Sequence, residues 1–230
     1  MPEHVLDAVL AEFPDPNRGD WLQFDSETER KLATKDDSQM GPVTRHVLAQ
    51  LNSAAFIDFL ERLTGIEALV PDPHFVGGGL HQIEPGGHLN VHADFNLHPR
   101  TKLERRLNVL IYLNRDWKDE YGGAFELWDK RMNGAVEKVM PYFNRCVVFS
   151  TTSTSFHGHP EPLTCPEGET RKSMALYYYS KDRPVHEQSA AHNTRWAARE
   201  PPAKRMKSDV KMFVPPILLQ WWRRARARKA

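Results

Sequence analysis

The chain has 230 residues and a net charge of +1, with 31 lysines and arginines against 30 acidic residues. This length fits one domain with extensions, or two small domains, and the charge balance excludes a chain-wide attraction to nucleic acid or anionic membranes. Two cysteines, Cys146 and Cys165, do not make a disulfide scaffold, so we expect a reducing, cytoplasmic environment. Residues 1–16 lack the apolar stretch of a signal peptide, and no apolar run is long enough to predict a membrane-spanning helix.

Helical patterns occur in the N-terminal third of the chain. Residues 4–13 are typical of a short amphipathic helix, whereas residues 14–42 are polar and turn-rich, which predicts an irregular segment. Across residues 44–63 apolar side chains recur at helical spacing, with Ser53 as a candidate cap and Gly65 as a stop signal. We therefore expect two helices here, packed on the outside of the structure that follows.

From residue 74 the pattern changes to short β-like runs divided by glycine and proline. The strands expected from these runs are 74–84, 88–94, 106–114, 123–129, 145–151 and 171–180, with a weaker one at 135–140. Short strands without intervening helices favour a sandwich or jelly roll over a parallel α/β sheet. We therefore predict a mainly β fold with flanking helices. After residue 181 the hydrophobic patterning fades, which predicts a polar linker.

A candidate metal site starts from His92 and Asp94. On a strand, side chains two residues apart project to the same face, so this pair could bind one ion from two adjacent corners. The best third ligand is His157, which follows the apolar run 146–149; His159 has the same strand parity and remains an alternative. Two histidines and one carboxylate leave positions open for O2 and a co-substrate, the pattern of non-haem iron(II) oxygenases.

Arg171 is a candidate anchor for a dicarboxylate co-substrate. It opens the expected strand 171–180, and a guanidinium is costly to bury in an apolar strand without an anion. Its planar donors also match a carboxylate bidentately. The alternative is that Arg171 points to solvent at the strand end, and Lys172 is a weaker competitor for the anchor.

These residues together resemble a known family. The order His-x-Asp, a later histidine and an arginine beyond it is similar to that of the 2-oxoglutarate- and iron(II)-dependent dioxygenases. Within them the chain resembles the prolyl hydroxylase group, because residues 107–117 (LNVLIYLNRDW) followed by Gly122 and Gly123 are similar to that group's core strand and hairpin. The likeness covers roughly residues 74–180. It implies a double-stranded β-helix, that is, a jelly roll.

The resemblance also implies roles for individual residues. It assigns the metal ligands to His92, Asp94 and His157, and the 2-oxoglutarate contacts to Arg171, Tyr112 and, on the same strand face, Asn108. No catalytic side chain is implied beyond the metal site. The cofactors would be Fe(II), 2-oxoglutarate as co-substrate and O2, with ascorbate as an optional reductant. The implied reaction hydroxylates a prolyl residue in a peptide or protein and releases succinate and CO2.

Other functions remain open. The enzyme could hydroxylate a small molecule or a cell-surface precursor, or the chain could be a cupin-like metal protein that does not use 2-oxoglutarate. Arg171 and Tyr112 count against the cupin-like alternative. A binding module that keeps the fold without catalysis is a further alternative, against which the complete set of ligands and anchor residues counts. No nucleic-acid partner is expected.

Three segments are expected along the chain. Residues 1–73 form a helical and irregular N-terminal segment packed on the core, residues 74–181 the catalytic jelly-roll domain, and residues 182–230 a polar linker and tail. The tail at 214–230 (VPPILLQWWRRARARKA) combines apolar and basic side chains. Contact with an anionic membrane surface, contact with RNA, and a last helix docked on the domain all remain open for it.

Overall fold

The structure is a computed structural model that describes residues 1–197. Its helices are α1 (Glu3–Ala11), α2 (Pro42–Leu51) and α3 (Ala54–Thr64), with short 3-10 turns at Asp37–Gln39, Asp119–Tyr121 and Val185–Glu187. Its strands are β1 (Leu22–Asp25), β2 (Glu29–Ala33), β3 (Val70–Pro71), β4 (Gly79–Ile83), β5 (His88–Ala93), β6 (Glu104–Tyr112), β7 (Phe125–Trp128), β8 (Ala135–Val139), β9 (Cys146–Ser150), β10 (His157–His159), β11 (Arg171–Ser180) and β12 (Arg195–Trp196).

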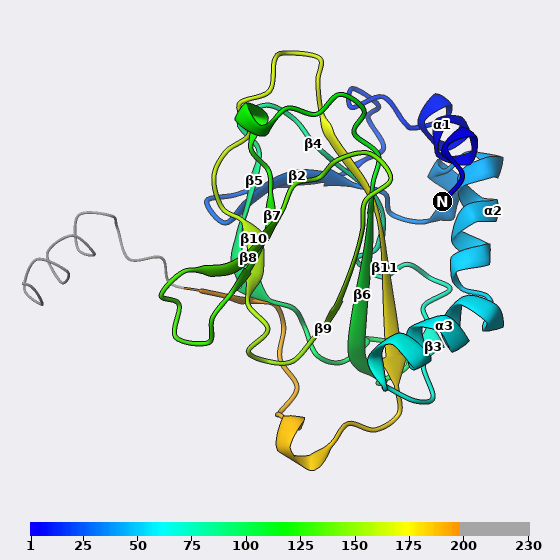
Figure 1. The fold of residues 1–230 in the computed structure, drawn as a ribbon, viewed down its shortest axis with the longest axis vertical. Coiled ribbons are helices and arrows are strands. Elements are labelled where there is room, and N and C mark those ends of the chain that lie inside the picture. The colour runs from blue at the N-terminus through cyan, green and yellow to red at the C-terminus, as the bar shows by residue number, and fades with distance from the viewer. Residues whose placement is uncertain (198–230) are drawn as a thin grey trace, which may run out of the picture. The chain divides into compact units, whose positions relative to one another are not determined.

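Antiparallel pairing joins these strands into one curled sheet. Its main path runs in the order β8-β7-β10-β5-β2-β4-β11-β6-β9. The sheet curls so that β4, β11, β6 and β9 form one wall and β5, β10, β7 and β8 form the wall that faces it (Figure 1). This arrangement is the predicted mainly β fold with flanking helices.

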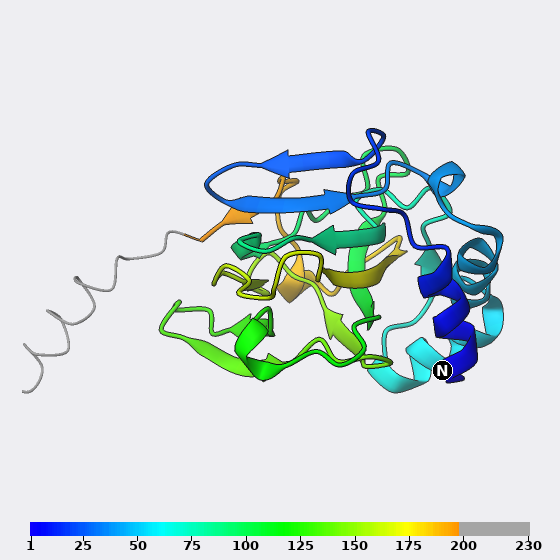
Figure 2. The same ribbon diagram turned by 90° about the horizontal axis from the view of Figure 1, so that it is seen from above.

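Along β6 and β11, successive side chains point alternately to the outer and the inner face of this wall. The outer face belongs to the main hydrophobic cluster, which includes Leu6, Val9, Leu48, Leu60, Leu107, Val109, Ile111, Met174, Leu176 and Tyr178. The helices therefore pack against the outside of this wall, on one side of the β-structure in both views (Figure 1, Figure 2). Because neighbouring strand residues point to opposite faces, Tyr112 of β6 and Arg171 of β11 are left to face the interior.

The expected helices and strands are present. α3 ends where Gly65 takes the left-handed conformation with φ of 70°, as the stop signal predicts. Ser53 occupies the position before α3, but its side chain makes no capping hydrogen bond. Local patterning therefore sufficed for these elements.

Strands occur in two segments where none was predicted, the expected irregular segment 14–42 and the expected polar linker after residue 181. Residues 14–42 supply the β1–β2 hairpin, and β2 lies between β4 and β5 in the sheet. β12, after residue 181, pairs Trp196 with His92 of β5. Both strands lack a run of alternating apolar residues, so their extended form depends on partners distant in the chain rather than on local pattern.

Several expectations remain outside what the structure tests. Within residues 1–197 no helix is long and apolar enough to cross a membrane. The tail at 214–230 lies outside the described residues, so contact with a membrane stays a prediction, and so does a cytoplasmic location.

Candidate metal and co-substrate site

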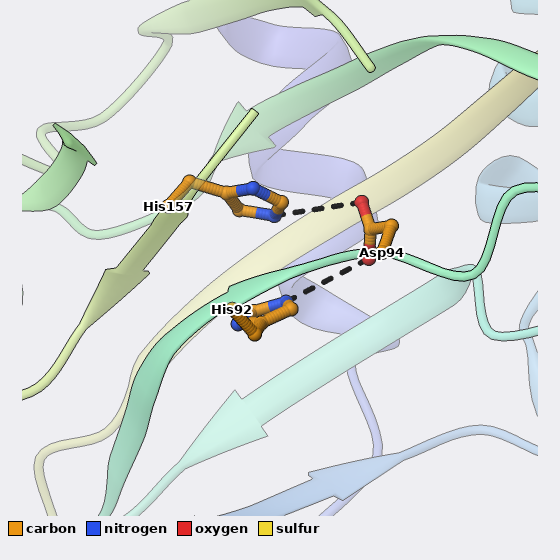
Figure 3. Close-up of side chains that lie close together, drawn as sticks. All are labelled: His92, Asp94 and His157. Atoms are coloured by element: carbon orange, nitrogen blue, oxygen red, sulfur yellow. Dashed lines mark ion pairs between the residues drawn. The ribbon is translucent and has the colours of Figure 1, made fainter. Parts of the chain in front are cut away.

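His92, Asp94 and His157 converge between the two walls. His92 lies near the end of β5, Asp94 follows that strand, and His157 begins β10 directly opposite His92. One ligand atom from each residue lies within 4.8 Å of the others, and the three side chains point toward one another (Figure 3). His159 is not part of this group, so the geometry favours His157 as the third ligand.

Hydrogen bonds to backbone carbonyls orient both imidazoles. His92 Nδ1 lies 2.8 Å from the Asn90 oxygen, and His157 Nδ1 lies 2.9 Å from the Ser155 oxygen. A carbonyl can only accept, so each Nδ1 carries a hydrogen, and in the neutral ring, the form that binds metal, each Nε2 keeps its lone pair. These Nε2 atoms lie 3.6 Å and 3.5 Å from the Asp94 oxygens, too far for a good hydrogen bond. Two lone pairs thus face a carboxylate, an arrangement that a bound cation stabilises.

The charge states agree with this donor set. Burial lowers the pKa of His157 to about 4, so its ring is neutral at pH 7. Burial by itself raises the pKa of Asp94, but the positive charge of Arg105 opposes this effect, and that pKa lies well below its usual value. A neutral imidazole and an ionised carboxylate are the forms that bind metal.

Arg105 holds the Asp94 carboxylate in place. Its Nη2 lies 2.9 Å from Asp94 Oδ2, and Asn108 Nδ2 donates to the same oxygen at 2.8 Å. Arg105 Nε also donates to Asn108 Oδ1 at 2.9 Å. The guanidinium also lies over the rings of Tyr177 and Phe95, 3.5 Å and 4.6 Å from their centroids. Two donors therefore hold this carboxylate oxygen in place.

Sequence reasoning missed Arg105 because of an irregularity in the sheet. Counting back in twos from Leu107 would place Arg105 on the outer face, with the helices. The register with β11 shifts here: Tyr178 pairs with Leu107 but Tyr179 pairs with Arg105, which leaves Arg106 as an extra residue on β6. A bulge of this kind turns the preceding side chain to the other face. No local signal in the sequence marks it.

Arg171 and Tyr112 meet in the interior at the other wall. Arg171 is 5% exposed, so it does not point to solvent. Its Nε donates to the Gly123 oxygen at 2.8 Å and its Nη2 to the Tyr112 hydroxyl at 3.2 Å. Within residues 1–197 no carboxylate forms an ion pair with Arg171. A buried guanidinium without a counter-charge is costly, which favours a bound anion at this position.

Lys172, the competitor for the anchor, faces the opposite way. Its ammonium donates to Thr170 Oγ1 at 2.5 Å and lies 5.9 Å from the ring of Phe13, which follows α1. Strand alternation therefore separates it from the interior.

An apolar cluster links the anchor to the metal ligands. Tyr112, Phe125 and Phe149 pack together, and the last two rings lie 5.7 Å and 4.7 Å from the His157 ring. The triad and Arg171 thus border one interior region whose lining disfavours water.

Trp196 is a second residue that sequence reasoning missed. Its ring lies 5.1 Å from that of His92, because β12 pairs with the ligand-bearing strand. Together with Phe95 and Leu97 it lines a pocket of about 470 Å³. The polar composition after residue 181 hides this contact, which only the folded chain creates.

Gly158 allows β10 to approach β5. A Cβ at this position would lie 2.7 Å from the Leu89 oxygen and 2.9 Å from the Asn90 oxygen, both in the backbone of β5. We expect Gly158→Ala to push the strands apart, to destabilise the protein by about 1–3 kcal/mol and to weaken metal binding through His157. Thermal unfolding and metal titration measure both effects. Gly19→Ala, where a Cβ meets nothing within 4 Å, is the control. Wild-type metal affinity in Gly158→Ala would contradict this expectation.

Residues 78–198, just over half of the chain, match the family model described as the 2OG-Fe(II) oxygenase superfamily. The chain belongs to this superfamily. The oxygenase is accordingly a dioxygenase whose cofactors are Fe(II) and 2-oxoglutarate, as the resemblance predicts. No curated protein sequence matches it.

Solved structures resemble the oxygenase at low sequence identity. A prolyl-4-hydroxylase from Pseudomonas putida matches with a TM-score of 0.56 and 19% identity, over 78% of this chain and 88% of that one. A prolyl hydroxylase from Trichoplax adhaerens, in complex with a hypoxia inducible factor peptide fragment, matches with a TM-score of 0.49 and 17% identity. The match covers 77% of this chain and 76% of that one. A viral collagen prolyl hydroxylase from Paramecium bursaria Chlorella virus 1, in complex with 2-oxoglutarate, matches with a TM-score of 0.49 and 11% identity. The match covers 78% of this chain and 91% of that one. The first of these confirms the jelly-roll fold.

Proposed function

We propose that the protein is a hydroxylase in which His92, Asp94 and His157 bind iron(II), and Arg171 and Tyr112 bind the distal carboxylate of 2-oxoglutarate. The observation that carries this proposal is the convergence of two unprotonated imidazole nitrogens on an ionised carboxylate. When bound, iron(II) and 2-oxoglutarate supply O2-dependent hydroxylation coupled to the release of succinate and CO2.

The side chains around the site have separate tasks in this proposal. The backbone contacts of His92 and His157 hold each Nε2 toward the ion. Arg105 keeps Asp94 ionised and oriented. Asn108 donates to Asp94, so we assign it to positioning this ligand rather than to the co-substrate contact that its strand face suggested.

For the substrate we propose a prolyl residue in a peptide or protein. Residues 107–117 resemble the prolyl hydroxylase group, and the fold is similar to that of a prolyl-4-hydroxylase. Trp196, which contacts His92, shares a pocket with Phe95 and Leu97, and this apolar, partly aromatic part of the wall suits a pyrrolidine ring. The polar residues Asn193 and Thr194 on the same lining could contact peptide backbone. A peptide lying across this pocket would contact Trp196, whose ring lies 5.1 Å from that of His92.

A peptide library tests this substrate class. The iron(II)-loaded protein is incubated with O2, 2-oxoglutarate and proline-containing peptides, and mass spectrometry detects the gain of one oxygen. We expect hydroxylated prolines, no gain in the same peptides with alanine for proline, and no product with Asp94→Ala. If every peptide stays unmodified while a small molecule accelerates succinate release, the peptide substrate is wrong but the hydroxylase assignment stands.

A further inference from the structure

His159 is a buried histidine that no protein group satisfies. It ends β10 and is 4% exposed. Within residues 1–197 neither its Nδ1 nor its Nε2 has a hydrogen-bond partner. By contrast, His81 and His88 each place Nε2 within 3.2 Å of a backbone oxygen, at 3.1 Å and 3.2 Å. A buried polar ring without partners destabilises the fold, and a bound molecule that supplies a partner removes this cost.

The surroundings of His159 indicate what that molecule carries. β10 pairs with β7 so that His157 lies opposite Leu127 and Gly158 lies opposite Glu126, and this register places His159 beside Phe125. Phe125 packs against Tyr112, whose hydroxyl accepts a hydrogen bond from Arg171 at 3.2 Å. An imidazole carries at least one N–H donor in either charge state. Arg171 has no carboxylate partner in the described part of the chain. The His159 imidazole and the Arg171 guanidinium therefore lie in the same region. A negatively charged hydrogen-bond acceptor would satisfy both.

We propose that His159 donates a hydrogen bond to the distal carboxylate of 2-oxoglutarate, beside Arg171 and Tyr112. The inference rests on the co-substrate site proposed above. One carboxylate offers about four lone-pair positions, enough for a guanidinium, a phenol and an imidazole together. His159 is then a residue that determines affinity and selectivity for this dicarboxylate, and not an alternative metal ligand.

Three substitutions at one position test the proposal. His159→Val removes both ring nitrogens and keeps a side chain that suits a strand. His159→Asn and His159→Gln keep an amide donor at two different reaches. The matched control is His88→Gln, since the His88 ring already faces the Glu27 oxygen. Calorimetry on iron(II)-loaded protein without O2 gives the dissociation constants of 2-oxoglutarate and of oxalate, which chelates iron but has no distal carboxylate.

We expect 2-oxoglutarate to bind His159→Val about 10-fold to 100-fold more weakly than wild type, the loss typical of a hydrogen bond to a charged group. At least one of the amide variants should bind it more tightly than His159→Val. Oxalate affinity and the His88→Gln variant should stay within about twofold of wild type. In the absence of ligand, His159→Val should unfold at the same or a higher temperature than wild type, because it removes unpaired buried atoms.

Two results overturn the proposal. One is 2-oxoglutarate affinity in His159→Val within about twofold of wild type. The other is an equal loss of oxalate affinity, which would place the effect of His159 at the metal rather than at the distal carboxylate. Failure of the underlying site looks different: Arg171→Ala would then bind 2-oxoglutarate as wild type does, whatever His159 contributes.

Discussion

Arg171→Ala is expected to raise the 2-oxoglutarate concentration for half-saturation by roughly 30-fold to 1,000-fold, which corresponds to about 2–4 kcal/mol. Arg171 is buried, and its Nε and Nη2 already engage Gly123 and Tyr112, so the remaining donors are held in a fixed direction. The substitution removes the cation that we propose to pair with the distal carboxylate of 2-oxoglutarate. Within residues 1–197 this cation has no acidic partner. Iron affinity should change little, because Arg171 contacts none of the triad.

The visible absorption band of 2-oxoglutarate chelated to iron(II) measures this effect. The band is titrated with 2-oxoglutarate in the absence of O2, and iron binding is measured separately in the same variant. Lys172→Ala is the matched control, since Lys172 is the next residue on β11 but lies over Phe13 on the helix side. Unchanged 2-oxoglutarate affinity in Arg171→Ala would remove this anchor. A wild type that binds iron but gives no band would contradict the proposed 2-oxoglutarate contacts of Arg171 and Tyr112.

Arg105→Met is expected to destabilise the metal-free protein by about 3–5 kcal/mol, because it leaves the Asp94 carboxylate buried without its cation. Arg105 is 2% exposed, makes an ion pair with Asp94 at 2.9 Å and is packed against Tyr177. Methionine retains much of the packing but none of the charge. Iron affinity should fall as well, since the ligand carboxylate loses one of the two donors that orient it.

Urea unfolding of the metal-free variants separates charge from packing. The double variant Arg105→Met with Asp94→Asn should be more stable than Arg105→Met alone, because no unpaired carboxylate remains. Arg115→Met is the control: Arg115 also pairs with Asp7 and lies 3.8 Å from the Phe143 ring centroid, but its side chain is 42% exposed. Its loss should stay within about 1 kcal/mol. A loss just as small for Arg105→Met would show that Asp94 does not depend on this cation.

Strand order and alternation made much of the site predictable. The i, i+2 rule places His92 and the residue at 94 together once the strand is recognised, and the same rule places Asn108 and Tyr112 on one inner face. The choice between His157 and His159 was not local. It depends on where β10 meets β5, and the register between these strands shifts within β10 itself.

The sequence by itself determined the helices, most strands, the fold class and the residue types of the proposed iron and 2-oxoglutarate sites, because apolar period and short-range spacing are local properties of a chain. Only the tertiary structure decided that β2 and β12 join the sheet, that a bulge at Arg106 turns Arg105 toward Asp94, and that Trp196 packs against His92. Each of these depends on partners brought from a distant part of the chain, and no pattern in the residues' own neighbourhood encodes that contact.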